Sequence, residues 1–330
     1  MDKTKKPFIS IITATWNREK FLKKLGNSLM KQTYKNFEWI IGNDGSTDNT
    51  DALVKKIALK ADFKIIYINS TLRIGKSKMD NLMNQNVSGE YLTQCGSDDI
   101  LLPNALKILS NLTKKIPKKE KDSYIGICAN SIDKNRVSQT FAKNQQTFKG
   151  EKSLYWEDLK KNTKGDATIL EQFKFLKNKK FLEVDFLITE SSLLDKLYCK
   201  KKFILTSKIV KIMDRSAENS ISFGKKLSYC RGSAYSIASD DYKKNFLNYS
   251  LLLKLKTVLN YWRYSVHGDI KFLRAKKMFK ATNNSSYYTL LFPLAYLVCT
   301  WDNILGKVEK THIEFNKNIK KTKITVDELN

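Results

Sequence analysis

Length, composition and charge limit what this chain of 330 residues can be. It is long enough to bury a full core and to form more than one domain. Its 60 lysine and arginine residues outnumber its 33 acidic residues, giving a formal net charge of +27. This charge favours an anionic partner, which could be a nucleic acid, an acidic membrane surface or a phosphate-rich substrate. Charge alone does not choose among the three.

The cysteines and histidines exclude several kinds of site. Five cysteines lie far apart in no paired spacing, which argues against a disulfide framework and a zinc ribbon and favours a reducing cytosol. The two histidines, His267 and His312, lie late in the chain and away from carboxylate-rich segments. A Ser-His-Asp triad or a His-rich metal site is therefore disfavoured, and we expect both histidines at the surface.

The N-terminal residues imitate a secretion signal, because lysines precede an apolar run. The run is short, is interrupted by serine and threonine, and lacks a small-residue cleavage site, so it does not fit a signal peptide. Residues 8–13 are short and β-branched and are predicted to form a buried first strand. No stretch reaches the roughly 18 uninterrupted apolar residues expected of a membrane-spanning helix.

Strand and helix patterns alternate after this first strand. Asn17 is predicted to cap a helix that ends near Gln32 and Thr33. The next predicted elements are a strand at 37–41, a helix after the turn-rich stretch 43–50, a strand at 63–68, a helix at 76–86 and a strand at 90–94. The alternation predicts a parallel sheet with right-handed crossovers, and such sheets bind ligands outside the carboxyl ends of their strands.

Three polar segments are expected to meet at that edge of the sheet: 13–17, 43–45 and 97–99. A glycine-rich dinucleotide fingerprint does not follow the first strand, and no Walker-type loop is present. Gly75-Lys76-Ser77 lacks the glycine five positions earlier that such a loop needs. The sequence therefore predicts a nucleotide site built from carboxylates and a metal.

Two adjacent carboxylates, Asp98 and Asp99, follow the strand at 90–94 and precede Pro103. Paired oxygen ligands at a sheet edge suit Mg²⁺ or Mn²⁺ rather than zinc. The alternative is that both aspartates only cap a helix beginning near Pro103, since Asp before an apolar run is a common start signal. The local sequence favours neither interpretation over the other.

Several motifs occur in an order and spacing that match a known family. They are the segments 9–18, 32–41, 43–48, 89–91 and 97–99, followed by Pro103. Over roughly residues 7–110 this order resembles the inverting family-2 glycosyltransferases of the GT-A fold, of the bacterial surface-polysaccharide type. The stretch from residue 164 to 190 is similar to the acceptor-side segment of bacterial members of this group.

The resemblance implies a metal-dependent transfer of a sugar from a nucleotide sugar, with UDP as the expected carrier. The acceptor would be a hydroxyl of a glycan or a lipid-linked glycan in cell-surface polysaccharide synthesis. Thr13, Thr15 and Asp44 are implied to line the base and ribose pocket, with Asp44 accepting a hydrogen bond from the base imide. Arg73 and Lys76 carry charge that suits the diphosphate.

The same resemblance implies that the loop containing Asp98 and Asp99 binds a metal. Asp98 would hold the ribose and the metal, and Asp99 would be the direct ligand of the Mn²⁺ or Mg²⁺ that bridges the diphosphate. The cation would neutralise the departing nucleoside diphosphate. The chain departs from its relatives at Gly96, where many carry aspartate, and at Arg73, where asparagine is usual.

Inverting transfer also needs a base for the acceptor hydroxyl. The candidates in the acceptor half are Asp166, Asp185 and Glu190. Glu190 precedes an apolar run and is predicted at the start of a helix, so it is the first choice as base, with Asp166 shaping the acceptor site. The alternative is that Glu190 is a first-turn carboxylate favoured by the helix dipole.

Composition divides the chain into a predicted GT-A domain at 1–240 and a basic, aromatic helical region at 241–330. The domain comprises a nucleotide-sugar half at 1–115 and an acceptor half at 116–240. The lysine-rich segment 110–164 contains one convincing strand, at 124–128.

The C-terminal region is predicted to form helices at 249–262 and 271–281, followed by an apolar aromatic patch at 287–301 and a lysine-rich tail. Aromatic residues beside lysines suit peripheral contact with an anionic membrane, at the inner face of the plasma membrane for a cytoplasmic protein. The alternative is a helix packed back on the catalytic domain.

A second hypothesis of another class stays open. The charge of +27 and the glycine at position 96 would also suit a non-catalytic polyanion- or nucleic-acid-binding protein on the same scaffold. Under the enzyme hypothesis no nucleic-acid partner is expected.

Overall fold

The computed structural model describes residues 6–134, 150–162, 167–184, 186, 188, 190–214, 230–238, 250–282, 286–306 and 322–329. The chain forms two compact units. The first unit comprises residues 1–180, 197–218 and 318–330, and the second comprises 181–196 and 219–317. The second unit thus contains the helices predicted after residue 240, whereas the last strand of the chain belongs to the first.

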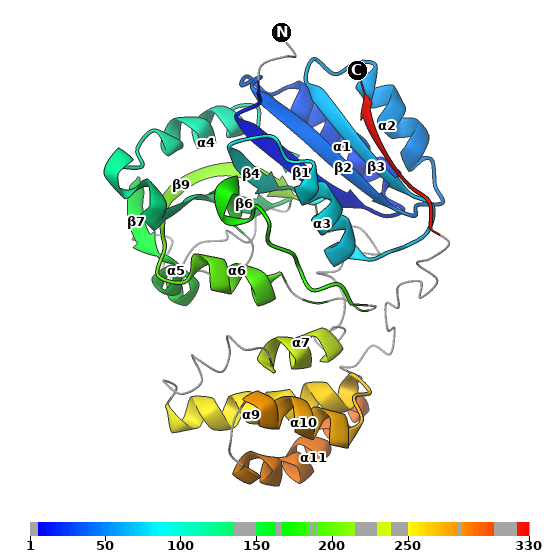
Figure 1. Ribbon diagram of the computed structural model, residues 1–330, viewed down its shortest axis with the longest axis vertical. Helices are drawn as coiled ribbons and strands as arrows, with labels where there is room; N and C mark the ends of the chain where they lie inside the picture. The colour runs from blue at the N-terminus through cyan, green and yellow to red at the C-terminus, as the bar shows by residue number, and fades with distance from the viewer. Residues whose placement is uncertain are drawn as a thin grey trace. The chain divides into compact units, whose positions relative to one another are not determined.

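Strands and helices alternate through the first unit, as the hydrophobic patterns predicted (Figure 1). Its elements are β1 (Ile9–Thr15), α1 (Glu19–Met30), β2 (Phe37–Asp44), α2 (Thr50–Ala58), β3 (Lys64–Ser70), α3 (Lys76–Gln85), β4 (Tyr91–Gln94), β5 (Asp99–Leu101), α4 (Ala105–Thr113), η1 (Lys118–Ser123), β6 (Tyr124–Asp133), β7 (Glu151–Tyr155), α5 (Trp156–Asn162), β8 (Thr168–Gln172), η3 (Phe173–Phe175), β9 (Lys202–Met213) and β10 (Ile324–Leu329). One further helix, α6 (Ser191–Tyr198), includes residues of both units.

The strands form one mixed sheet in the order β10-β3-β2-β1-β4-β8-β6-β9-β5, with β7 paired to β9. Strands β3, β2, β1 and β4 pair in parallel, which confirms the predicted parallel arrangement for this part of the sheet. Beyond β4 the sheet is mixed, because β8 runs antiparallel to both β4 and β6, while β6 and β9 are parallel.

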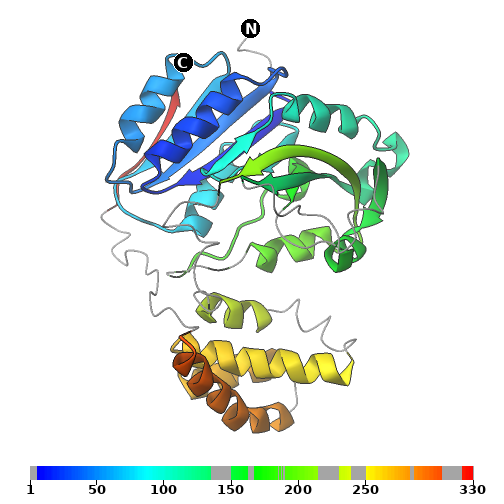
Figure 2. The same cartoon turned by 180° about the vertical axis from the view of Figure 1, so that it is seen from behind.

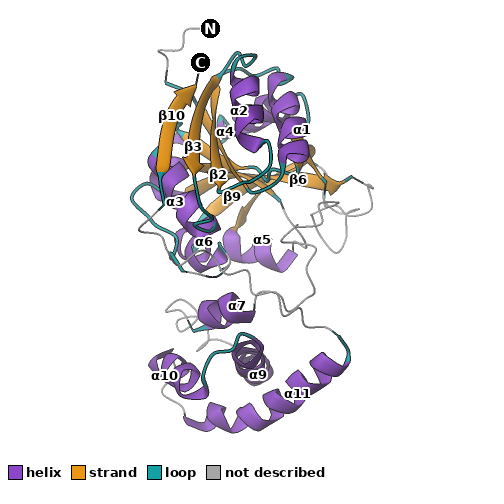
Figure 3. Cartoon of the chain, turned by 90° about the vertical axis from the view of Figure 1, so that its right-hand side faces the viewer, coloured by secondary structure: helices purple, strands orange, loops and turns teal. Residues whose placement is uncertain are grey.

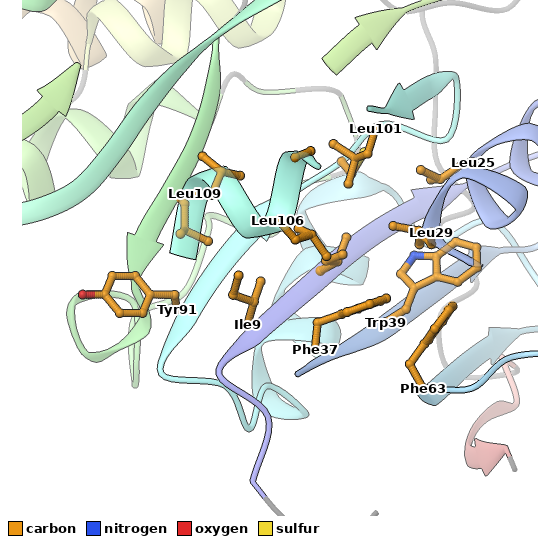
Figure 4. Close-up of a cluster of buried hydrophobic side chains, with 14 of the residues drawn as sticks. Ile9, Leu25, Leu29, Phe37, Trp39, Phe63, Tyr91, Leu101, Leu106 and Leu109 are labelled. Atoms are coloured by element: carbon orange, nitrogen blue, oxygen red, sulfur yellow. The ribbon is translucent and has the colours of Figure 1, made fainter. Parts of the chain in front are cut away.

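Helices cover both faces of the parallel strands. On one face, α1 and α2 lie over the strands, as Figure 2 shows from behind, and α4 adds to the same core. Figure 4 shows this core, in which Trp39 lies among leucines such as Leu25 and Leu29. On the opposite face (Figure 3), α3 packs so closely that a Cβ at Gly42 would lie 2.5 Å from Met79 Cγ. Both faces of these strands are buried, which explains their almost unbroken apolar sequences.

Strand β10 was not predicted from the sequence, where it follows a lysine-rich stretch. It pairs antiparallel with β3 and covers that edge of the sheet (Figures 1 and 2). The Lys323 carbonyl accepts a hydrogen bond from the Thr71 backbone at 3.0 Å, which fixes the start of the pairing. The middle of this strand, residues 326–328, is exposed, as suits a strand at the edge of a sheet.

The second unit is helical in its described part. Its helices are α7 (Cys230–Ile237), α9 (Leu251–His267), α10 (Phe272–Thr282), η4 (Ser286–Leu291) and α11 (Phe292–Ile304). These confirm the helices predicted at 249–262 and 271–281. Tyr261 and Trp262 of α9 form the core of this unit with Phe279 and Ala295. No helix among the described residues has the length and apolar character needed to cross a bilayer.

A buried ion pair joins two helices of the second unit. Arg263 donates two hydrogen bonds of 2.6 Å to the Asp302 carboxylate, and His267 Nε2 lies 3.2 Å from Asp302 Oδ2. The prediction of a surface position is therefore wrong for His267, whose side chain is only 4% exposed. Its carboxylate partner lies 35 residues away, so no local pattern in the sequence indicates the pairing. His312 lies outside the described residues.

One predicted helix cap is also wrong, and the alternative that Asp98 and Asp99 cap a helix is excluded. Asn17 does not cap α1, which begins after Arg18 without a side-chain cap. Asp98 and Asp99 do not cap the helix after Pro103, because α4 has Asn104 at its N-cap position and Asp99 begins the short strand β5. The two carboxylates are therefore available for another role.

Candidate active site

The three polar segments predicted to meet at the carboxyl edge of the parallel strands do meet. Asn17 adopts a positive φ of 51° and turns its side chain toward the loop after β2, where its Oδ1 accepts a hydrogen bond from the Thr47 backbone at 2.7 Å. The Asn17 backbone in turn donates to Ser46 Oγ at 2.9 Å. Arg18 reaches the third segment, where its guanidinium lies 3.0 Å from Asp98. Local polar contacts thus bring the ends of β1, β2 and β4 together.

Asp44 ends β2 and holds the start of α3. Its carboxylate accepts hydrogen bonds from the backbone of Ile74 at 2.6 Å and of Gly75 at 3.1 Å. Burial raises the pKa of Asp44, although these backbone donors and Arg73 act in the opposite direction. The predicted hydrogen bond from a nucleotide base to Asp44 stays a prediction, and in this structure the carboxylate orders the loop before α3 by accepting from its backbone.

Arg73 lies over an aromatic ring beside Asp44. Its guanidinium carbon is 3.7 Å from the centroid of the Trp16 ring, and its Nε is 4.0 Å from Asp44 Oδ2. Gly45 makes this approach possible, because it has a φ of +70° and a Cβ there would lie 2.5 Å from the Arg73 backbone nitrogen. The contact with Trp16 thus holds the positive charge of the guanidinium beside the site.

The two threonines of β1 differ in their surroundings. Thr13 is fully buried, and its hydroxyl accepts a hydrogen bond from the Trp39 indole at 3.0 Å. The buried hydroxyl of Thr15 has no hydrogen-bond partner among the described residues. An orphaned buried hydroxyl has a free-energy cost that a ligand can relieve, so Thr15 suits the predicted pocket better than Thr13 does.

Lys76 lies at the first turn of α3, where its ammonium is 2.6 Å from the buried carboxylate of Asp80. The positive charge predicted to suit a diphosphate is therefore already balanced by a neighbour one turn along the helix. The predicted contact of Lys76 with a donor stays a prediction.

The loop predicted to bind a metal, residues 95–99, is held by two cationic side chains and is called the metal loop below. Asp98 Oδ2 pairs with Arg18, and burial raises the Asp98 pKa against the effect of that guanidinium. Asp99 Oδ2 accepts hydrogen bonds of 2.8 Å from the Gly96 backbone and from the ammonium of Lys211 on β9. Both carboxylates are therefore paired with cationic side chains and held in place.

Gly96 lies at the point where the two carboxylates converge. A Cβ at this position would be 2.9 Å from Asp98 Oδ1 and 3.1 Å from Asp99 Oδ2. The absence of a side chain thus lets both carboxylates lie against the loop backbone, which gives the departure from the family pattern a physical reason.

The residues present fit a divalent cation that arrives with a diphosphate. Among the described residues, no three His, Cys, Asp or Glu side chains form a group that could enclose a metal. Mg²⁺ and Mn²⁺ bound to nucleotides need only one or two protein carboxylates, because phosphate oxygens and water complete the shell. The converging carboxylates of Asp98 and Asp99 meet that requirement.

The predicted base lies in the second unit. Glu190 precedes α6, and its carbonyl accepts hydrogen bonds from the Leu193 and Leu194 backbones, so the predicted helix start is confirmed. Whether Glu190 acts as a base is a prediction that these contacts do not test. Asp166 and Asp185, the other candidates, lie outside the described residues.

Sequence reasoning missed two residues that hold the metal loop, Arg18 and Lys211. Arg18 lies inside a recognised motif but received no role. Lys211 interrupts the apolar end of β9, and a lysine in a buried strand is itself a signal of a partner carboxylate. The sequence could have shown that Lys211 has a partner, but not that the partner is Asp99.

Comparison with known proteins defines the family. The family model described as glycosyl transferase family 2 matches residues 10–183, which is more than half of the chain. The chain belongs to this family. The sequence prediction is thus confirmed for the family and for the enzyme class, and the alternative of a non-catalytic binding protein gains no support.

Two relatives show how far the similarity extends. Glycosyltransferase GlyG of Streptococcus pneumoniae is 29% identical over 212 residues, which cover 62% of this chain and 68% of that protein. The GalNAc(5)-diNAcBac-PP-undecaprenol beta-1,3-glucosyltransferase of Campylobacter jejuni is 23% identical over 330 residues, covering 94% of this chain and all of that protein.

A solved structure supports the fold. S. aureus TarS 1-349, crystallised in complex with UDP-GlcNAc, is 16% identical with a TM-score of 0.59, and the match covers 94% of this chain and 97% of that one. At this identity the similarity concerns the fold alone. The predicted GT-A fold with C-terminal helices is confirmed.

Proposed function

We propose that this protein is an inverting, metal-dependent glycosyltransferase that uses a UDP-linked sugar. It transfers the sugar to a hydroxyl of a glycan or lipid-linked acceptor in cell-surface polysaccharide synthesis. The observation that carries the proposal is the meeting of Asp44, the Arg73–Trp16 stack and the Asp98–Asp99 pair at one sheet edge. The UDP-GlcNAc complex of TarS and the undecaprenol-linked acceptor in the name of the Campylobacter relative support the donor and acceptor classes.

Each group at the edge has a proposed task. Asp44 accepts a hydrogen bond from the base, Thr13 and Thr15 line the base and ribose pocket, and Arg73 and Lys76 provide positive charge for the diphosphate. Asp98 contacts the ribose and, with Asp99, holds a Mn²⁺ or Mg²⁺ ion. When bound, that ion supplies Lewis-acid stabilisation of the leaving nucleoside diphosphate.

The proposed chemistry is a single displacement at the anomeric carbon. The acceptor oxygen forms a bond to this carbon as the bond to the diphosphate oxygen breaks, which inverts the configuration. Glu190 takes the proton of the acceptor hydroxyl, and Asp166 shapes the acceptor site. The product is a glycoside together with UDP.

Transfer assays test this function. The full-length protein is incubated with Mn²⁺, a panel of UDP-sugars and lipid-linked acceptors extracted from a bacterial membrane, and UDP release and a mass increase of one sugar are measured. We expect one UDP-sugar to be consumed and an axial-to-equatorial change at the anomeric carbon, or the reverse, by NMR. Retention of configuration, or no turnover of any nucleotide sugar, would contradict the proposal.

We also propose that residues 241–330 contact an anionic membrane, which places the enzyme at the inner face of the plasma membrane. On α11, Leu294, Leu297, Trp301 and Ile304 are 50% to 70% exposed and recur at helical spacing. The sequence 290–304 contains one charged residue, Asp302, which is buried. Exposed cations on α10, such as Arg274, Lys276 and Lys277, suit anionic headgroups.

Sedimentation with vesicles tests the membrane contact. We expect the wild type to sediment with phosphatidylglycerol-containing vesicles and the double variant Leu297→Ser, Trp301→Ser to remain in the supernatant. The matched control is Leu59→Ser, because Leu59 is an exposed leucine of the first unit, at 88%. Equal sedimentation of the double variant and the wild type would overturn the membrane proposal and leave the transferase proposal intact.

A further inference from the structure

The cation that holds Asp99 comes from a distant part of the chain. Lys211 lies 112 residues after Asp99, and its ammonium is 2.8 Å from Asp99 Oδ2. The contact forms because β5 and β9 pair antiparallel, with Leu101 opposite Lys211 and Asp99 opposite Met213. The acceptor-half strand β9 thus places a positive charge against the loop proposed to bind the metal.

Burial makes this ion pair strong. The Lys211 and Asp99 side chains are 8% and 9% exposed, so little water screens the two charges. Interactions between charges are much stronger in such surroundings than at the surface. Lys211 is therefore a fixed positive charge in the loop rather than a mobile surface group.

The contacts of Asp99 gather on one oxygen. Oδ2 accepts from the Gly96 backbone and from Lys211, and Cys95 Sγ lies 3.9 Å from it. A divalent ion on this carboxylate shares it with the Lys211 ammonium, and the two positive charges repel each other.

We propose that Lys211 is an internal counter-ion that controls when the metal loop takes up a divalent cation. Arg18 and Lys211 already balance the charges of Asp98 and Asp99, so the loop binds a free cation weakly. A diphosphate supplies the missing negative charge, and the cation is retained only together with the nucleotide. This inference rests on the metal-dependent function proposed above and assigns Lys211 as a positioning residue that acts through Asp99.

Coupling between the two ligands follows directly. If UDP raises the affinity for Mn²⁺, then Mn²⁺ raises the affinity for UDP by the same factor. Direct contact between the diphosphate and the cation also contributes to this coupling. The change in coupling when the charge of Lys211 is removed therefore measures the part that Lys211 provides.

Three variants separate the charge of Lys211 from a purely structural role. Lys211→Gln removes the charge and keeps a hydrogen-bond donor, whereas Lys211→Arg keeps the charge. The matched control is Lys202→Gln, which removes the same charge from the same strand at a surface pair with Glu120. Thermal melts followed by circular dichroism report whether each variant is folded.

Titration of the full-length protein with Mn²⁺, in which electron paramagnetic resonance measures the free ion, tests the proposal with and without UDP. We expect the wild type, Lys211→Arg and Lys202→Gln to bind Mn²⁺ weakly alone and more tightly with UDP. Without UDP, Lys211→Gln is expected to bind Mn²⁺ about ten-fold more tightly than the wild type, because one buried repulsive charge is gone. The factor by which UDP raises the Mn²⁺ affinity is expected to be smaller in Lys211→Gln than in the wild type.

The outcomes distinguish this inference from the proposed function. UDP-dependent Mn²⁺ uptake by the wild type, with unchanged or weaker uptake by folded Lys211→Gln alone, would overturn the inference and leave the function standing. Equal Mn²⁺ affinity of the wild type with and without UDP would also overturn it, whether or not Lys211→Gln folds. No Mn²⁺ uptake by the wild type even with UDP would overturn both.

Discussion

The sheet edge of the first unit and the helical second unit treat polar groups in opposite ways. At the edge, carboxylates and cations from segments distant in sequence converge and form ion pairs and hydrogen bonds. In the second unit, the Arg263–Asp302 pair is turned inward between helices, and the outward face of α11 carries uncharged side chains. The difference indicates that the first unit is built to bind a charged small molecule and the second to present an apolar surface.

The largest expected effect separates donor binding from catalysis. Glu190→Gln is expected to lower the rate of sugar transfer about 10²–10⁴-fold, because the proposed base can no longer take the acceptor proton. Binding of UDP to the first unit should be unchanged by calorimetry. Transfer at the wild-type rate would show that Glu190 is only a first-turn carboxylate.

A stability difference between the two units is the next expected effect. Asp302→Asn leaves Arg263 without its bidentate partner, and we expect the second unit to lose about 3 kcal/mol of stability. Hydrogen exchange of peptides from α9 and α11 measures this loss, and β1 and β2 report on the first unit. The matched control is Asp51→Asn, which breaks an exposed pair with Lys55 and should cost less than about 0.5 kcal/mol.

The pH dependence of the same pair has a definite sign. Burial acts to raise the pKa of Asp302, but hydrogen bonds from Arg263 and His267 outweigh it and hold the pKa below the ordinary value. The stabilisation is therefore complete above the unfolded pKa of about 4 and is lost as the pH falls through the lower folded pKa. We expect hydrogen exchange in α11 to accelerate in this acidic range for the wild type but not for Asp302→Asn.

A smaller effect is expected where the loop backbone approaches the carboxylates. Gly96→Ala places a Cβ about 3 Å from both carboxylates, whose flexible ends can shift. We therefore expect a nearly unchanged melting temperature and an affinity for Mn²⁺ in the presence of UDP that is about ten-fold weaker. Wild-type affinity in this variant would mean that the converging geometry does not matter for the cation.

The smallest expected effect concerns the stacked guanidinium. Arg73→Ala removes the contact with Trp16 and is expected to weaken UDP binding about five-fold. Arg73→Lys keeps the charge and loses the planar stacking, so we expect it to recover part of the affinity. Calorimetry with UDP and Mn²⁺ compares the two variants, and equal affinity of Arg73→Ala and the wild type would remove Arg73 from the donor site.

The sequence predicted the features that depend on local patterns, and it missed those that depend on contacts between residues far apart in the chain. The first strands and helices follow from β-branched runs and helical repeats, and the meeting of Asp44 with Asp98 follows from the topology of parallel strands. The pairing of Lys211 with Asp99 depends on a β5–β9 register formed over 112 residues, which no local pattern contains. Strand β10 was missed for the same reason, because its partner β3 lies more than 250 residues earlier.

The most direct test of the proposed donor site is ³¹P NMR of UDP with Mn²⁺, because the paramagnetic ion broadens the phosphate signals of nucleotide held beside it. We expect the wild type to bind UDP with Mn²⁺ bound at the diphosphate, and Asp99→Ala to lose most of the Mn²⁺-dependent part of this binding. If UDP binding depends on Mn²⁺ as strongly in Asp99→Ala as in the wild type, the assignment of the metal loop is contradicted.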